Sequence, residues 1–134
     1  MKVFLDTNVL VSALSTHGLC SDVLREILSD HQLIISSFLI VELKRVLTEK
    51  IQLPKELINE SISFLRYIGE ISDPLNRPNI DITDQDDIPL IHSALYGEAD
   101  LFVTGDKELL SLKVVNKMMV VSPRAFWELL RSQQ

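Results

Sequence analysis

Four acidic residues come where a predicted strand ends or a predicted helix begins: Asp6, Glu42, Asp87 and Asp106. Carboxylates that converge without lysine or arginine partners repel one another, so they must bind protons or cations. Mg²⁺ and Mn²⁺ suit hard oxygen ligands, and Mg²⁺ usually keeps waters or binds substrate phosphates. Such ions activate water and stabilise the leaving oxygen of a phosphodiester. If the four side chains meet, the chemistry they suit is metal-assisted phosphodiester hydrolysis.

The elements that must position these acids alternate along the chain, as in an α/β domain with a largely parallel sheet. Short apolar runs, mostly without alternation, predict strands that are covered on both faces, at residues 2–5, 33–36, 67–71, 101–104 and 118–121. Segments with helical spacing of apolar residues predict helices at 22–29, at 38–49, from Pro54, at 87–96 and from Ser122-Pro123.

This order of elements places the acids at one edge of the sheet. Asp6 directly follows the first strand, and Asp106 follows the fourth by a turn at Gly105. Ligands of open α/β sheets bind outside the carboxyl ends of the strands, so these two carboxylates are expected to meet there. Glu42 lies one turn into the helix after the second strand. Asp87 begins the fourth helix, where the helix dipole favours an anion.

Each acid also has a purely structural interpretation. Asp6 and Asp106 could be turn residues, and Glu42 taken alone could be a solvated helix acid. Asp84, Asp86 and Asp87 could be caps and turn formers, which we favour for one or two of them. All four acids together, each at a strand exit or helix start, are harder to explain in this way.

Length, cysteine content and net charge limit the class of protein. The 134 residues predict one domain over 1–134, since single cores usually occupy about 100–150 residues. Cys20 is the only cysteine, which excludes an internal disulfide and fits a reducing compartment. No targeting segment or membrane span is visible, so we expect a soluble, cytoplasmic protein. The net charge of −6 argues against a generic nucleic-acid binder, although acids gathered at a cation site would contribute to it.

A set of motifs in this order resembles the PIN-domain nucleases over essentially the whole chain: Asp6-Thr7-Asn8, Glu42 inside a helix, Asp87 before an apolar helix reaching Ala94, and Thr104-Gly105-Asp106. The fit is closest to the VapC-like branch, the toxin components of prokaryotic toxin–antitoxin pairs. The resemblance implies a three-layer α/β/α fold around a mostly parallel five-stranded sheet. It also implies a Mg²⁺- or Mn²⁺-dependent ribonuclease that cleaves single-stranded RNA.

The same resemblance assigns roles to residues. It makes the four acids catalytic metal ligands, with Asn8 and Thr104 orienting them through hydrogen bonds. Either Asp86 or Asp87 could supply the third acid; the apolar spacing that follows favours Asp87, with Asp84 and Asp86 assisting. No histidine is well placed to be a sole general base. Candidate phosphate contacts are Lys44, Arg45 and Lys107, for which a solvated charged face is at least as good an explanation.

Three alternatives remain open at this point. One is a PIN fold kept as a non-catalytic binding module, which the presence of all four acids opposes. Another is a phosphatase or receiver domain, which Asn8 in place of a second Asp opposes. The third is a metal-dependent DNA nuclease or structure-specific nuclease, whose chemistry is closer to that of the ribonuclease. The resemblance further implies a cognate antitoxin and a homodimer as partners, with Phe126 and Trp127 able to offer apolar contact area although core positions suit them better.

Overall fold

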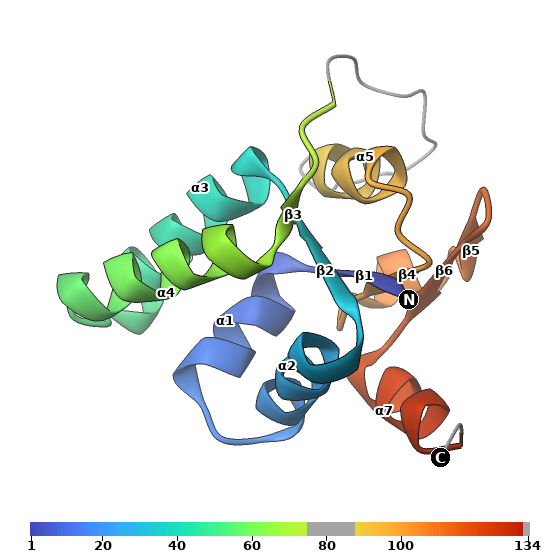
Figure 1. The fold of residues 1–134 in the computed structure, drawn as a ribbon, viewed down its shortest axis with the longest axis horizontal. Coiled ribbons are helices and arrows are strands. Elements are labelled where there is room, and N and C mark those ends of the chain that lie inside the picture. Colours follow the sequence, from blue (N-terminus) through green and yellow to red (C-terminus); the bar gives the residue numbers. More distant parts are fainter. Residues whose placement is uncertain (75–87, 133–134) are drawn as a thin grey trace.

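The computed structural model describes residues 1–74 and 88–132, and these form a six-stranded sheet in the order β3-β2-β1-β4-β6-β5 (Figure 1). Neighbouring strands from β3 to β6 pair in parallel, and β5 pairs antiparallel with β6. The strands are β1 Lys2–Leu5, β2 Gln32–Ile35, β3 Glu70–Ile71, β4 Leu101–Val103, β5 Val114–Val115 and β6 Met118–Val121.

Helices cover both faces of the sheet. They are α1 Thr7–Ser15, α2 Leu19–Asp30, α3 Ser37–Val46 with its π-helical continuation η1 Leu47–Ile51, α4 Lys55–Ile68, α5 Ile88–Tyr96, α6 Lys107–Leu110 and α7 Pro123–Ser132. Figure 1 shows α1, α2 and α7 on one side of the sheet and α3, α4 and α5 on the other. The predicted three-layer α/β/α fold with a mostly parallel sheet is therefore confirmed. No described helix is long and apolar enough to cross a membrane.

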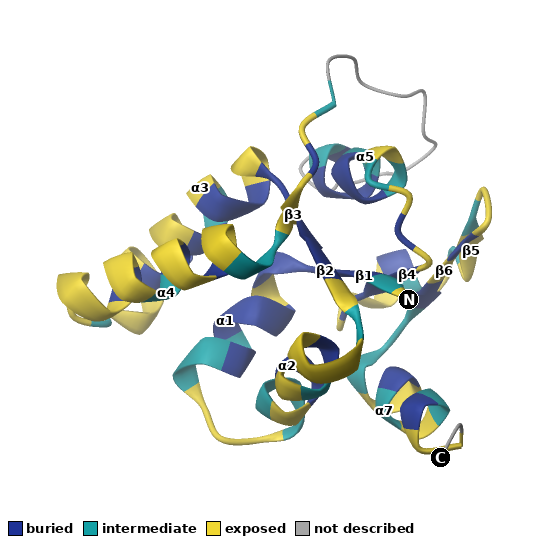
Figure 2. Ribbon diagram, viewed as in Figure 1, coloured by how far each residue is buried: buried dark blue, intermediate teal, exposed yellow. Residues whose placement is uncertain are grey.

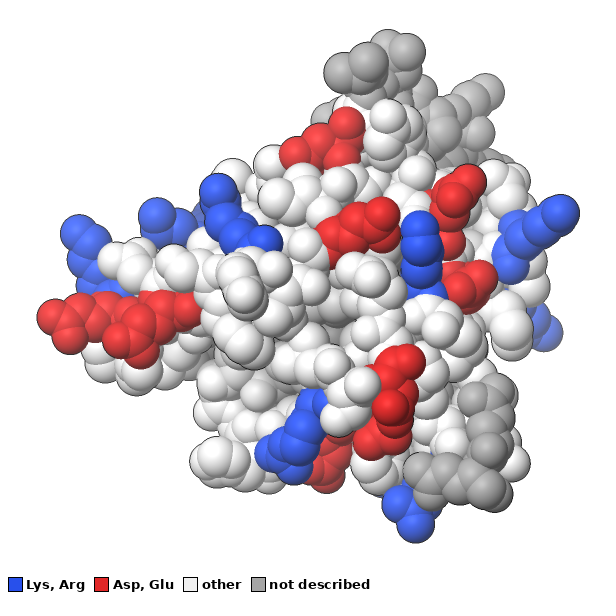
Figure 3. All heavy atoms as spheres, viewed as in Figure 1, with Lys and Arg blue, Asp and Glu red and all other residues white. Residues whose placement is uncertain are grey.

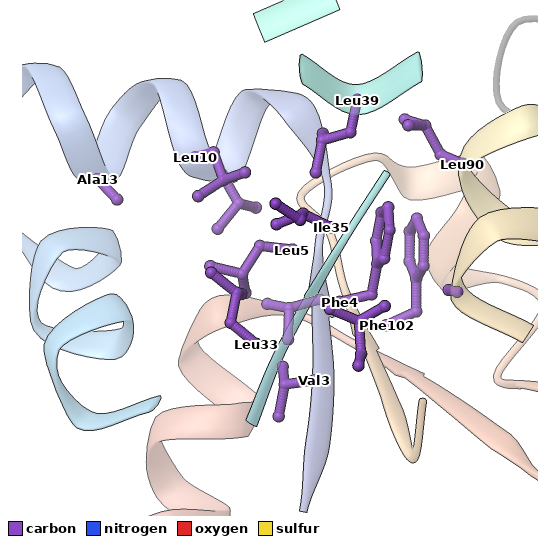
Figure 4. Packing of buried hydrophobic residues seen from close by; sticks show 14 of the residues in the cluster. Val3, Phe4, Leu5, Leu10, Ala13, Leu33, Ile35, Leu39, Leu90 and Phe102 are labelled. Carbon is purple, nitrogen blue, oxygen red and sulfur yellow. The ribbon is translucent and has the colours of Figure 1, made fainter. Parts of the chain in front are cut away.

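The core lies between these layers because the central strands are apolar on both sides. Val3, Phe4 and Leu5 of β1 are fully buried (Figure 2), as expected for a parallel strand that helices cover on both faces. The rings of Phe4 and Phe102 stack with centroids 5.4 Å apart, next to Leu39 and Leu90 in Figure 4. These contacts fix β1 against β4, which sets the position of everything that follows the two strands.

The predicted start of the third strand was wrong. The strand predicted over 67–71 contains only two residues, because the amphipathic pattern of α4 continues through Ile68 and leaves Tyr67 exposed on the helix. Gly69 then ends the helix. A Cβ at Gly69 would lie 2.8 Å from the Leu65 carbonyl oxygen and 3.0 Å from the Ile35 side chain, so the chain passes closely there.

The structure contains elements that the sequence analysis did not predict, and one predicted helix ends differently. Helix α1 and the short α6 were not predicted, and neither was β5. The helix predicted to Glu49 changes to π-helical geometry at Leu47 and ends at Gln52, which has a φ of 59°. In α7, Phe126 is fully buried and Trp127 packs partly against the core, in agreement with core positions for both.

Candidate active site

The pairing of β1 with β4 brings Asp6 and Thr104 together. Phe4 is opposite Phe102 and Leu5 is opposite Val103, so the next residues along the two parallel strands are again neighbours. The backbone N–H of Asp6 donates to the Val103 carbonyl at 2.9 Å, which extends this ladder past the end of β1. The strand order also changes direction here, because β2 lies on one side of β1 and β4 on the other. Open α/β sheets bind ligands at such a point.

Thr104 connects two of the predicted acids. Its hydroxyl donates to Asp6 Oδ2 at 2.6 Å and accepts the backbone N–H of Asp106 at 3.0 Å. Thr104 is fully buried and Asp6 is only 6% exposed, so water does not compete strongly for these bonds. The hydroxyl thus holds the Asp6 carboxylate and the Asp106 backbone in a fixed relation.

Asp106 is exposed and also caps α6. Its Oδ1 accepts the backbone N–H groups of Glu108 at 2.8 Å and Leu109 at 3.2 Å. This is the helix-capping role that Asp, Asn, Ser and Thr favour. The second carboxylate oxygen, Oδ2, takes no part in these two bonds. The structural and the functional interpretation of Asp106 are therefore compatible, one for each oxygen.

Glu42 is held from α1 by a residue that the sequence analysis did not single out. The buried Thr7 hydroxyl donates to Glu42 Oε2 at 3.1 Å, so the first residue of α1 orients an acid on α3. The start of α3 is fixed in turn by Asp73, whose two oxygens accept the Ser37 backbone N–H at 2.7 Å and the Ser37 hydroxyl at 2.6 Å. The signal for Thr7 was its place between Asp6 and Asn8.

The electrostatics of Asp6 reflect its setting. Burial raises the pKa of Asp6 above its ordinary value of 3.8, and the Asp106 carboxylate raises it further. Hydrogen bonds from the Thr104 hydroxyl and the Thr7 backbone N–H oppose this by favouring the charged form. No ion pair within residues 1–74 and 88–132 joins Asp6 or Asp106 to a basic side chain. A bound divalent cation would relieve both the burial cost and the repulsion.

The donor chemistry fits Mg²⁺ or Mn²⁺, because the described part of the site offers carboxylate oxygens and a threonine hydroxyl, without sulfur or imidazole. The described residues do not by themselves make a metal centre: among them, no group of three or more His, Cys, Asp or Glu side chains could hold an ion together. Asp84, Asp86 and Asp87 lie outside the described residues, so the predicted third acid and its assistants stay predictions.

The remaining candidates are not joined to these acids. Asn8 is exposed, and within the described chain no hydrogen bond links its side chain to Asp6, Glu42 or Asp106. Candidate phosphate contacts are exposed: Lys44, Arg45 and Lys107. In Figure 3, Lys and Arg side chains gather over the α3 and α4 helices, while acidic and basic groups alternate over the rest of that face. That face therefore offers no broad basic surface.

Comparisons with known proteins agree with this fold. The model of the PIN domain family matches residues 2–108. A solved chain from VapBC2 of Rickettsia felis, in a complex bound to a DNA fragment from their promoter, has a similar fold with a TM-score of 0.62. The two chains are 18% identical, and the similarity covers 91% of this chain and 98% of the other. No match was found among curated proteins.

Proposed function

Because this chain belongs to the PIN-domain family, whose members are generally nucleases, we propose that it is a Mg²⁺- or Mn²⁺-dependent endoribonuclease that cleaves single-stranded RNA. The observation that carries the proposal is the arrangement of Asp6, Thr104 and Asp106 where β1 and β4 end, with Glu42 hydrogen-bonded to Thr7, the residue after Asp6. Asp6 and Asp106 form no ion pair with a basic side chain in residues 1–74 and 88–132, and they lie at the position where open α/β sheets bind ligands.

In this proposal Asp6, Glu42, Asp87 and Asp106 hold the metal, which supplies an activated water and stabilises charge on the phosphodiester. The Thr104 hydroxyl orients Asp6 and, by bonding to its carboxylate, partly opposes the rise of its pKa that burial causes. The Thr7 hydroxyl orients the Glu42 carboxylate through its own hydrogen bond. Asp106 presents one oxygen to the site while its other oxygen is fixed by α6.

We further propose that the protein is the toxin of a toxin–antitoxin pair. Support comes from the PIN family match and from the similarity of fold to a chain of VapBC2. The partner would be a cognate antitoxin that covers the acidic site, and the toxin itself would be a homodimer. Co-expression with the neighbouring reading frame, followed by size-exclusion chromatography with light scattering, tests both partners.

Cleavage of an end-labelled single-stranded RNA tests the enzymatic proposal. Purified protein is assayed with Mg²⁺, with Mn²⁺ and with EDTA, and a single-stranded DNA of the same sequence is included. We expect metal-dependent cleavage of the RNA that Asp6→Asn abolishes and that the exposed control Asp30→Asn retains. Equal cutting by wild type and Asp6→Asn would point to a contaminating nuclease, and preferential cutting of DNA would favour the DNA-nuclease alternative.

A further inference from the structure

An exposed aromatic side chain stands beside Glu42 on α3. Phe38 is 42% exposed, one helical turn before Glu42 and on the same side of the helix, since residues four apart are neighbours. Together with Val41, Glu42 and Arg45 it lines a shallow open pocket of about 270 Å³. The pocket therefore shares a wall with the candidate active site.

The lining of this pocket combines three kinds of group. Phe38 offers an aromatic face, and Val41, which is 69% exposed, offers apolar area next to it. Arg45 offers a positive charge. Its ion pair with Glu49 has an N–O distance of 3.6 Å, and both side chains are at least half exposed. Exposed pairs of this kind are weak, so Arg45 can exchange Glu49 for a phosphate.

We propose that this pocket, defined by Phe38, Val41, Glu42 and Arg45, binds one nucleotide of the RNA strand, with its base stacked on Phe38 and its phosphate near Arg45. Bases stack on exposed aromatic side chains in single-strand binders, with cations along the backbone. The pocket is smaller than the roughly 300–1,000 Å³ of drug-sized sites and has charges at its rim. That favours a nucleotide over an extended apolar peptide.

The inference rests on the proposed nuclease function and adds to it a nucleotide subsite. The sequence analysis named Arg45 as a candidate phosphate contact but did not single out Phe38, which is one aromatic residue in a predicted helix. Its exposure next to Glu42 appears only when α3 is packed against the sheet.

Binding measurements with an inactive protein test the subsite. In the Asp6→Asn background, fluorescence anisotropy gives the Kd of a labelled 12-nucleotide single-stranded RNA in Mg²⁺. A second set of RNAs carries one abasic ribose at each position in turn. We expect Phe38→Ala to weaken binding of the intact RNA at least about fivefold. One RNA of this set places its abasic ribose in the pocket. For that RNA, we expect Phe38→Ala to cause no further loss of affinity.

Matched variants distinguish stacking on Phe38 from the loss of any exposed aromatic side chain. Phe64 on α4 is 47% exposed and does not line the pocket, so Phe64→Ala is expected to leave the Kd unchanged. Phe38→Tyr is expected to retain binding and Phe38→Leu to lose it. Equal effects of the two alanine variants would overturn stacking on Phe38. Full binding of the RNA by Phe38→Leu would also overturn it, because an apolar contact without stacking predicts that result.

Failure of the subsite is distinguishable from failure of the nuclease. If wild-type protein cleaves RNA and Phe38→Ala binds and cleaves it normally, the subsite is wrong while the nuclease stands. If the wild-type protein does not cleave RNA and the Asp6→Asn variant does not bind it, both the subsite and the nuclease proposal are wrong.

Discussion

Replacing Thr104 by Val should destabilise the metal-free protein by about 2–4 kcal/mol. The substitution keeps a β-branched side chain of similar shape but removes a fully buried hydroxyl. That hydroxyl makes two bonds, one donated to Asp6 Oδ2 at 2.6 Å and one accepted from the Asp106 backbone at 3.0 Å. Both partners stay in place after the substitution and lose their bond.

The magnitude follows from the two bonds. A hydrogen bond to a charged group contributes about 1.5–3 kcal/mol, and one between neutral groups about 0.5–1 kcal/mol. For 134 residues the unfolding entropy is about 280 cal/mol/K, at about 2.1 cal/mol/K per residue. The expected loss therefore lowers the Tm by about 7–14 °C. Since single domains are stable by about 5–15 kcal/mol, the variant still folds.

Urea unfolding and differential scanning calorimetry in EDTA measure the loss. Thr104→Ser keeps the hydroxyl and serves as the matched control, with a smaller loss expected from its missing methyl group. In the Asp6→Asn background, Thr104→Val should cost less, because the acceptor no longer carries a full charge. If Thr104→Val and Thr104→Ser unfold at the same Tm, or the cost is the same in both backgrounds, the bond to the Asp6 carboxylate does not stabilise the fold as argued.

Three further predictions concern other contacts. Asp6→Asn should raise the unfolding free energy in EDTA at pH 7, because the raised pKa of Asp6 means that its charge costs stability above that pKa. This gain should shrink as the pH falls towards 3.8. Urea titrations in which the wild type is the more stable protein at pH 7 would contradict the prediction. Thr7→Val should weaken Mn²⁺ binding about tenfold in calorimetric titration, because it removes the hydroxyl that orients Glu42, and Thr7→Ser should retain the wild-type affinity. Equal affinities of wild type and Thr7→Val would show that the hydroxyl does not orient Glu42 for the metal. Gly97→Ala should cost about 1–3 kcal/mol in urea unfolding, because the new Cβ would lie 2.7 Å from Ile34 Cγ2, and an unchanged midpoint would mean that the chain relaxes there.

The layers were predictable from the sequence because the buried strands are nearly pure apolar runs. The strand at residues 2–5 and the strand at 118–121 have the predicted bounds, since Asp6 ends the first apolar run and Lys117 and Ser122 flank the second. The strand predicted at 67–71 was too long because Tyr67 and Ile68 suit a strand in composition, while the packing of α4 holds them in a helix. Helix α1 was not predicted; it begins one residue after β1, and its β-branched residues Thr7, Val9 and Val11 lower its helix propensity.

The sequence predicted that Asp6 and Asp106 follow two strands, but not which hydrogen bonds would hold them. Asp6 and Thr104 could be placed at strand ends from the pattern alone. Their hydrogen bond depends on the register of β1 with β4, which only tertiary packing fixes. The contact of Thr7 with Glu42 depends on the approach of α1 to α3, which no local pattern encodes.

The bond between Thr104 and Asp6 joins residues 98 positions apart in the chain. Closing so long a loop is entropically costly, and contacts of this range form slowly. During synthesis, at about 5–20 residues per second, every nascent chain that stops short of β4 therefore lacks one half of this pair. Proteolytic fragments that end before residue 104 lack it too, so this contact exists only after most of the domain has been made.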